Sequence, residues 1–301
     1  MTPTLVRRHR SRTGPAPRTD LGARARDWSE IQERMLVPLY EAVYERLEVG
    51  PGTRLLGLGC GSGLALLTAA SRGAALTGVE AAFPERLSLA RQRLVPQAFG
   101  PHPRKPVRLV DGTPRDLADG TRGGKPDAKS APKPGPKPAP YNLVTAFEPI
   151  GCLAGDSEGL GEQLAAAAPL AERGSPVVLV GWGPPERCAT STVLRVATEL
   201  AEPVHHTGSW RPALRDDLEE VAHRAGLKPD GSGRVACPFG YAGVDSALKG
   251  LLSTGLFDAA ITATDQAQVD KEVTEALHPY RRKDGTVWMP NVFRYLIART
   301  T

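Results

Sequence analysis

The stretch RLLGLGCGSG, residues 54–63, runs from a short apolar segment into a loop in which every second residue is glycine. A helical pattern over residues 64–71 follows it directly. Glycine lets the backbone adopt positive φ and approach a ligand closely, and the first turn of a helix offers unpaired N–H groups to an anion. At the carboxyl end of a strand in an open α/β sheet, this arrangement predicts a ligand-binding loop.

Apolar segments and helical patterns alternate on both sides of this loop. Strands are expected at residues 53–58, 74–79, 107–110, 142–146, 176–180, 234–239, 286–289 and 292–298. Helices are expected at residues 27–49, 64–71, 84–94, 160–172, 216–225, 244–252 and 265–277, the first of them with Asp27 or Ser29 as N-cap. Strands that are apolar throughout and alternate with helices predict a doubly wound, mostly parallel α/β sheet covered on both faces.

The net charge of +5 over 301 residues is unevenly distributed. Residues 1–26 carry seven arginines and one aspartate, residues 121–140 carry a charge of +4, and the rest of the chain is acidic. We expect a disordered basic tail over residues 1–26 and a domain over residues 27–301, interrupted by a disordered Pro/Lys-rich insertion at about 119–140. The arms suit either a polyanion or simple solubilisation, and their lack of aromatic side chains for base stacking favours the second interpretation.

Several classes of protein are excluded by composition. No apolar stretch reaches the roughly 18 residues that a membrane helix needs, and no apolar segment of a secretory signal follows the N-terminal arginines. The four cysteines, Cys60, Cys152, Cys188 and Cys237, are too scattered for a CxxC site. We therefore expect a cytoplasmic protein without a metal centre.

The spacing of the loop glycines limits the choice of cofactor. The dinucleotide fingerprint G-x-G-x-x-G fails in every register, and the phosphate-binding pattern G-x-x-x-x-G-K-[ST] is absent. The remaining pattern, G-x-G-x-G, suits an adenosine cofactor without a pyrophosphate. Glu80 ends the next expected strand, where a ribose diol would be held, although strand-end carboxylates also occur without any ligand.

The chain resembles the class I S-adenosylmethionine-dependent methyltransferases. The resemblance lies in residues 56–63 (LGLGCGSG), 78–80 (GVE), 109–112 (LVDG), 141–147 (YNLVTAF) and 177–183, which occur in the family's order. Residues 291–298 (NVFRYLIA) are similar to the close of actinobacterial small-molecule methyltransferases. The resemblance implies a Rossmann-like methyltransferase fold, with a seven-stranded sheet, a reversed last strand and added helices.

The resemblance also implies an activity, methyl transfer from S-adenosylmethionine to a small, natural-product-like acceptor. The [DNS]-P-P-[YF] motif of nucleic-acid amino-methylating enzymes is absent, since FEPI stands at residues 147–150. Nucleic acid and membrane are therefore not expected as partners, and a homodimer is left open. Trp182, after the fifth strand, is the aromatic residue expected nearest to the acceptor.

The resemblance also implies a role for each matching residue of this chain. The loop glycines would pass beneath the methionine and ribose, Glu80 would accept the ribose hydroxyls, and Asp111 with Gly112 would hold the adenine edge. Phe147 and Glu148 would lie beside the sulfonium. The implied cofactor-binding residues are Gly57, Gly59, Cys60, Gly61, Gly63, Glu80, Asp111, Gly112, Phe147 and Glu148.

Two positions depart from the family. Gly57 stands where relatives usually have an acid within reach of the cofactor's ammonium group, a contact worth about 1.5–3 kcal/mol. Glu148 is a candidate for an acid near the sulfonium or that ammonium, and no other catalytic residue is assigned. The departures keep open a catalytically silent, methyltransferase-like module that binds a protein or nucleic-acid partner through the basic arms. A dinucleotide-dependent dehydrogenase is the remaining alternative.

Overall fold

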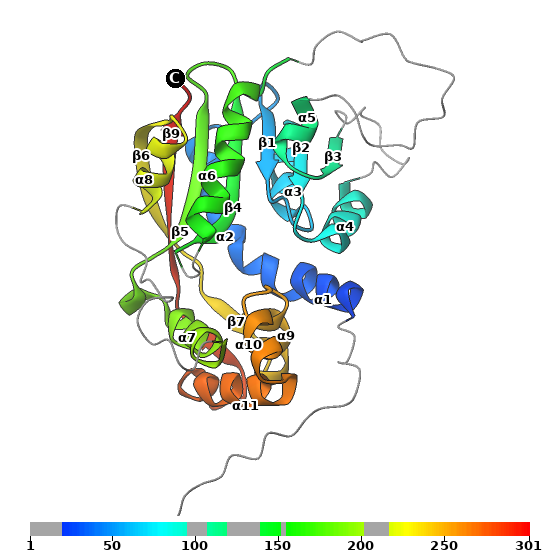
Figure 1. The fold of residues 1–301 in the computed structure, drawn as a ribbon, viewed down its shortest axis with the longest axis vertical. Coiled ribbons are helices and arrows are strands. Elements are labelled where there is room, and N and C mark those ends of the chain that lie inside the picture. The colour runs from blue at the N-terminus through cyan, green and yellow to red at the C-terminus, as the bar shows by residue number, and fades with distance from the viewer. Residues whose placement is uncertain (1–19, 95–106, 119–138, 152–154, 202–216) are drawn as a thin grey trace, which may run out of the picture.

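The computed structural model describes residues 20–94, 107–118, 139–151, 155–201 and 217–301. Its centre is a seven-stranded sheet in the order β3-β2-β1-β4-β5-β9-β6 (Figure 1). These strands are β1 (Arg54–Leu58), β2 (Ala75–Glu80), β3 (Val107–Asp111), β4 (Leu143–Ile150), β5 (Pro176–Trp182), β6 (Lys228–Ala236) and β9 (Val292–Arg299). β1 pairs in parallel with β2 and β4, whereas β9 lies antiparallel between β5 and β6. The expected doubly wound sheet with a reversed last strand is confirmed.

Helices cover both faces of the sheet. The strand side chains alternate between two cores: Leu55 belongs to one, and Leu56 and Leu58 belong to the other. The first core is closed by α2 (Val37–Arg46), α3 (Leu64–Ser71) and α4 (Pro84–Leu94), and the second by α5 (Pro114–Ala118), α6 (Asp156–Ala167) and α8 (Asp217–Arg224). This two-sided burial explains why the strands are apolar throughout.

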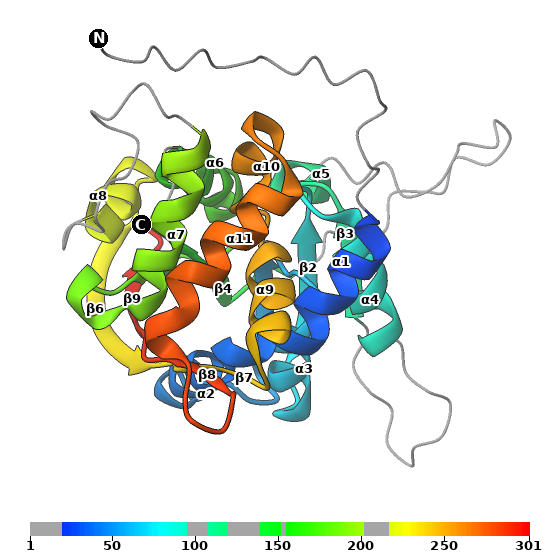
Figure 2. The same ribbon diagram turned by 90° about the horizontal axis from the view of Figure 1, so that it is seen from below.

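A second layer lies beyond the carboxyl ends of the parallel strands. It consists of α7 (Ala189–Ala201), α9 (Val244–Leu252), α10 (Asp258–Ala263), α11 (Gln266–Leu277) and the small antiparallel pair β7 (Phe239–Tyr241) and β8 (Val287–Met289). Figure 2, viewed from that end, shows these helices in front of the sheet. Among the described residues, no helix is long and apolar enough to cross a membrane.

The N-terminal segment differs from its prediction. The single helix expected over residues 27–49 is divided into α1 (Leu21–Asp27), the π-helical turn η1 (Trp28–Gln32), the 3₁₀ turn η2 (Glu33–Leu36) and α2. Pro38, in the first turn of α2, has no N–H to continue the hydrogen-bond ladder of the preceding turns, so a new helix begins there.

The predicted disordered tail is wrong for residues 20–26, which begin the ordered fold. Asp20, and neither Asp27 nor Ser29, is the N-cap: its Oδ1 accepts from the N–H of Ala23 at 3.0 Å. Arg24 donates to Asp258 of α10 at 2.8 Å, which ties the first helix to the second layer. The helix was not predicted because the many arginines of residues 1–26 are typical of a disordered segment. Residues 1–19 and 119–138, which hold most of both basic arms, lie outside the described residues.

Other elements also differ from their predicted bounds. α5, α7 and α10 were not expected, and α6 begins at Asp156 rather than at residue 160. β6 begins at Lys228, although its first residues, KPDGSG, are those of a turn. Pairing with β9 holds this stretch as a strand, with a register irregularity between Pro229 and Gly231. Tertiary pairing here overrides local propensity.

Candidate functional site

The glycine loop lies between β1 and α3, at the carboxyl end of the central strand. Gly59 and Gly61 adopt φ of 55° and 56°, in the left-handed region that other residues rarely occupy. A Cβ on Gly61 would lie 3.3 Å from both Glu33 Oε1 and Trp28 Nε1. Gly61 therefore needs to be glycine for two reasons, its backbone conformation and the close approach of the N-terminal segment.

Glu80, at the end of β2, holds the loop from the neighbouring strand. Its buried carboxylate accepts from the N–H of Gly61 at 3.0 Å, of Ala82 at 3.0 Å and of Phe83 at 3.2 Å. An ionised carboxylate accepts about four hydrogen bonds, so these three leave it a site for a further donor. Glu80 thus combines a structural contact with capacity for a ligand hydroxyl.

The N-terminal segment covers this loop, which the sequence patterns did not indicate. Glu33 is only 3% exposed and accepts from Ser62 Oγ, from the N–H of Leu64 at 3.2 Å and from Arg93 at 2.8 Å. By accepting from the N–H of Leu64, Glu33 satisfies one of the unpaired donors at the N-terminus of α3, where an anion would otherwise bind. The contacts join residues about thirty to sixty positions apart. No local pattern could have revealed them.

Trp28 is the second residue of this cover. Its Nε1 is buried and has no hydrogen-bond acceptor among the described residues. Its ring stacks on the guanidinium of Arg86, whose Cζ lies 3.9 Å from the ring centroid. An unpaired buried donor costs free energy, so this indole N–H is suited to a ligand acceptor above Gly61.

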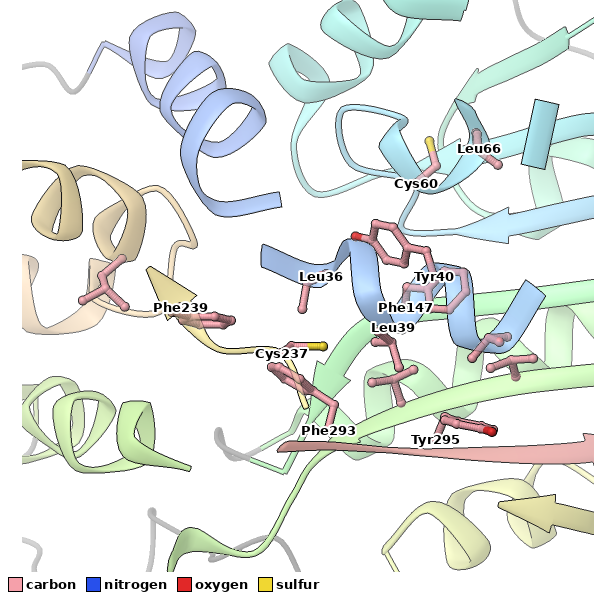
Figure 3. Close-up of a cluster of buried hydrophobic side chains, with 14 of the residues drawn as sticks. Leu36, Leu39, Tyr40, Cys60, Leu66, Phe147, Cys237, Phe239, Phe293 and Tyr295 are labelled. Atoms are coloured by element: carbon pink, nitrogen blue, oxygen red, sulfur yellow. The ribbon is translucent and has the colours of Figure 1, made fainter. Parts of the chain in front are cut away.

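Aromatic side chains form the floor of the site. Phe147, at the end of β4, is buried with its ring centroid 4.8 Å from that of Tyr40 and 5.5 Å from that of Tyr44. Cys60 of the loop and Leu66 of α3 belong to the same buried cluster as Tyr40 and Phe147 (Figure 3). Burial raises the pKa of the Cys60 thiol well above its ordinary value, so this cysteine is a small apolar residue here and not a nucleophile.

Two cavities meet at the glycine loop. The first has a volume of about 30 Å³ and lies between the loop and its N-terminal cover; Trp28, Glu33 and Arg86 are among its lining residues. The second has a volume of about 240 Å³ and lies between β4, α6 and Trp182. Both cavities are lined by Leu58, Gly59 and Glu148. The first holds one or two waters at most, and the second approaches the size of a small-molecule pocket.

Glu148 stands between the cavities and lines both; its side chain reaches solvent, while the protein around its carboxyl group desolvates the charge. Among the described residues, no hydrogen bond or ion pair to its carboxylate is found. Burial raises the pKa of Glu148, with Glu80 and Asp156 adding to the rise, and nearby Arg86 opposes it. A carboxyl group with a raised pKa is suited to accept and release a proton.

Arg86 is the cation that lowers the pKa of Glu148, but its N–H groups donate to other residues. It is 3% exposed and donates to the carbonyls of Ser253 at 2.6 Å and Thr254 at 3.3 Å. Burial lowers the pKa of Arg86 to about 10, which Glu148 and Glu80 partly oppose. It therefore links α4 to the second layer and leaves the Glu148 carboxylate available to a ligand.

The structure brings together most of the residues expected to bind a cofactor. The first cavity is lined by Gly57, Gly59, Cys60, Gly61, Glu80, Phe147 and Glu148. Gly63, Asp111 and Gly112 do not line either cavity. Gly63 instead caps α3 with a φ of 82°, and Asp111 is exposed beside Glu80 at the end of β3.

Gly57 has a structural role that the sequence did not suggest. A Cβ there would lie 3.0 Å from Leu66 Cδ2 and 3.7 Å from Leu55 Cδ2. An acid at this position would therefore enter an apolar contact. An acid at residue 57 could reach a ligand only if the side chain of Leu66 moved.

Comparisons with known proteins support the architecture. No protein-family model matches the chain, and no curated protein matches its sequence. The structure of YjhP from Escherichia coli is 17% identical, covers 93% of this chain and 99% of its own, and has a TM-score of 0.50. BH2331, a candidate methyltransferase from Bacillus halodurans, is 13% identical over 87% of this chain and 98% of its own, with a TM-score of 0.49.

A third structure matches a smaller part of the chain. It is the S-adenosylmethionine-bound CalS10, an amino pentose methyltransferase from Micromonospora echinaspora. The match is 27% identical over 49% of this chain and 51% of that chain, with a TM-score of 0.34. Strand order and the antiparallel β9 match the Rossmann-like methyltransferase fold expected from the sequence, and YjhP shares the fold of this chain.

Proposed function

We propose that the chain is a methyltransferase that uses S-adenosylmethionine and acts on a small-molecule acceptor. The observation that carries this proposal is the glycine loop itself. Gly59 and Gly61 hold left-handed conformations at the end of β1, and the carboxylate of Glu80 reaches the loop from β2. Backbone and carboxylate together suit an adenosine cofactor that carries no pyrophosphate.

The residues over the loop fit the chemistry of such a cofactor. The buried Nε1 of Trp28, without an acceptor among the described residues, suits the cofactor's carboxylate. Glu80 has capacity for a ribose hydroxyl. The cavity of about 30 Å³ is too small for a nucleoside, so the cofactor enters only when the cover formed by Trp28 and Glu33 moves outward.

The protein's part in the reaction is binding, exclusion of water and proton transfer. When bound, the cofactor supplies the methyl group and its own leaving group. The loop and Glu80 hold it, while Phe147 and Tyr40 form an apolar floor. Glu148, between the two cavities, is the group placed to take a proton from an acceptor in the second cavity.

The test is calorimetric titration of the full chain with S-adenosylhomocysteine. We expect micromolar binding, weakened about ten- to a hundredfold by Glu80→Gln, because a charged acceptor is lost while the size of the side chain is kept. Glu45→Gln, at an exposed position of α2, is the matched control and should bind as the unaltered chain does. Absence of binding up to millimolar concentration would overturn the proposal, as would unchanged binding by Glu80→Gln.

A second candidate function follows from the same small cavity. A catalytically silent module that binds a macromolecular partner through the basic arms needs no room above the loop, and about 30 Å³ is consistent with that. Under this alternative, S-adenosylhomocysteine would not bind. Removal of residues 1–19 and 121–138, which keeps α1 and its Asp20 cap, would abolish capture of the partner in pull-down experiments.

A further inference from the structure

Three donors beside the glycine loop converge on one carboxylate. They are the Oγ of Ser62, the N–H of Leu64 at 3.2 Å and the guanidinium of Arg93 at 2.8 Å. They come from the loop, from α3 and from α4. The Nη1 of Arg93 also donates to the carbonyl of Ser62 at 2.8 Å, which fixes the guanidinium in place. A hydroxyl, a helix N-terminus and a guanidinium together form a complete site for a carboxylate.

The carboxylate in this site is the protein's own. It belongs to Glu33, which is buried and comes from the N-terminal cover, residues 21–36. A further contact, from Arg93 to Ser29 Oγ at 2.7 Å, holds the cover at the same place. Glu33 and Gly61 both line the cavity of about 30 Å³ above the loop. An anion site is therefore filled from within, at the wall of the cavity proposed for the cofactor.

A donor next to this site is left without an acceptor. Trp28 Nε1 is buried and unpaired among the described residues. Trp28 Nε1 and Glu33 Oε1 each lie 3.3 Å from the position that a Cβ on Gly61 would take, so the free donor and the bound carboxylate are neighbours. A small anionic ligand above Gly61 has here a donor that Glu33 leaves unused.

We propose that Glu33 is an internal competitor of the cofactor: its carboxylate occupies the site that takes the carboxylate of the cofactor's amino-acid end. This inference rests on the methyltransferase function proposed above and names a regulation of the same site. Cofactor binding exchanges one carboxylate for the other and releases Glu33. The contacts that hold the cover in the free protein therefore oppose binding.

Charge and space both favour exchange over binding beside Glu33. Two carboxylates at one guanidinium repel each other, and a cavity of about 30 Å³ does not hold a second carboxylate together with the rest of a ligand. After exchange, Arg93 still has an anionic partner, so no buried charge is left unpaired.

The first test is calorimetric titration of Glu33→Gln with S-adenosylhomocysteine. The amide keeps the size of the side chain and removes the charge that competes for Arg93. We expect binding about tenfold or more tighter than by the unaltered chain. Glu30→Gln, at an exposed position of the same cover, is the matched control and should bind as the unaltered chain does. Unchanged or weaker binding by Glu33→Gln would overturn the inference.

A second test asks whether the ligand's carboxylate reaches Arg93. The preference for S-adenosylhomocysteine over 5′-methylthioadenosine, which lacks the amino-acid end, should fall about tenfold in Arg93→Gln. A ratio of two affinities in one protein cancels effects of the variant on the free state. Arg91→Gln, at an exposed position of α4, should keep the preference. An unaltered preference in Arg93→Gln would rule out the exchange.

A third test uses the linkage between binding and folding. Glu33→Ala should be less stable than the unaltered chain in urea, and saturating S-adenosylhomocysteine should narrow this difference, because the bound state no longer uses Glu33. If Glu33→Ala does not fold alone, the ligand should restore its folding. A difference of equal size with and without ligand would contradict the proposal.

The outcomes separate this inference from the function on which it rests. Binding of S-adenosylhomocysteine that Glu80→Gln weakens and Glu33→Gln leaves unchanged would overturn the exchange alone. Absence of binding by both the unaltered chain and Glu33→Gln would overturn the methyltransferase proposal as well.

Discussion

Desolvation, together with the charges of Glu80 and Asp156, raises the pKa of the Glu148 carboxyl group. A carboxyl group with a raised pKa holds a proton in the folded chain that the unfolded chain has released. The group therefore has no effect on the free energy of unfolding well below the unfolded pKa of about 4.3. As the pH rises towards and through the folded pKa, its ionisation increasingly lowers the free energy of unfolding. The residue keeps this carboxyl group beside the loop, as expected for a group used in proton transfer.

Replacing this carboxyl by an amide should stabilise the fold in a pH-dependent manner. We expect Glu148→Gln to unfold at a higher temperature than the unaltered chain at pH 8 and at nearly the same temperature near pH 4. Thermal unfolding followed by circular dichroism at both pH values checks this. Glu162→Gln is the control, since Glu162 lies on the surface of α6 and lines neither cavity. An equal gain at both pH values would contradict the assignment.

At the scale of elements, the segment formed by α1, η1 and η2 is attached to the glycine loop mainly through Glu33. Glu33→Ala leaves Ser62, the Leu64 N–H and Arg93 without this acceptor. We expect a loss of about 3 kcal/mol in the free energy of unfolding, the lower end for a broken buried pair, because Arg93 keeps some contact with water.

Urea unfolding measures this loss. Glu30→Ala is the matched control, since Glu30 lies in the same segment and is exposed. Its stability should change by less than about 0.5 kcal/mol. Equal stability of the two variants would show that the cover is not held by Glu33.

At the scale of the whole molecule, the last strand joins the sheet to the second layer. β9 lies between β5 and β6, and its fully buried Phe293 contacts Trp182 of the sheet at 4.7 Å between centroids and Phe239 of β7 at 6.1 Å. We expect Phe293→Ala to cost about 3–5 kcal/mol of unfolding free energy. Phe293→Leu keeps most of the apolar volume and should cost about 1 kcal/mol.

Chemical denaturation of the two variants tests the role of this strand. If β9 unites both layers, Phe293→Ala should unfold in one transition with a lower midpoint. A separate early transition of the second layer would show that the layers unfold independently.

The sequence by itself determined the alternation of the parallel strands with most of their helices and the position of the glycine loop. Apolar runs bounded by glycine and proline mark buried strands, and the bounds of α3, α4 and α9 agree with their predictions because periodic helices between such signals leave little alternative. The loop and Glu80 were predictable for the same reason. Their conformations and spacing depend on residues that are close together in the chain.

Only the tertiary structure decided what covers the loop and what lies beside it. Glu33, Trp28 and Arg93 meet the loop through contacts between distant segments, and the second cavity joins Asp156 to Glu148 across two elements. The structure also placed Asp111 outside both cavities and made Gly57 part of an apolar contact with Leu66. Such proximities follow from how the layers pack, and side-chain packing across layers leaves no periodic signal in the sequence.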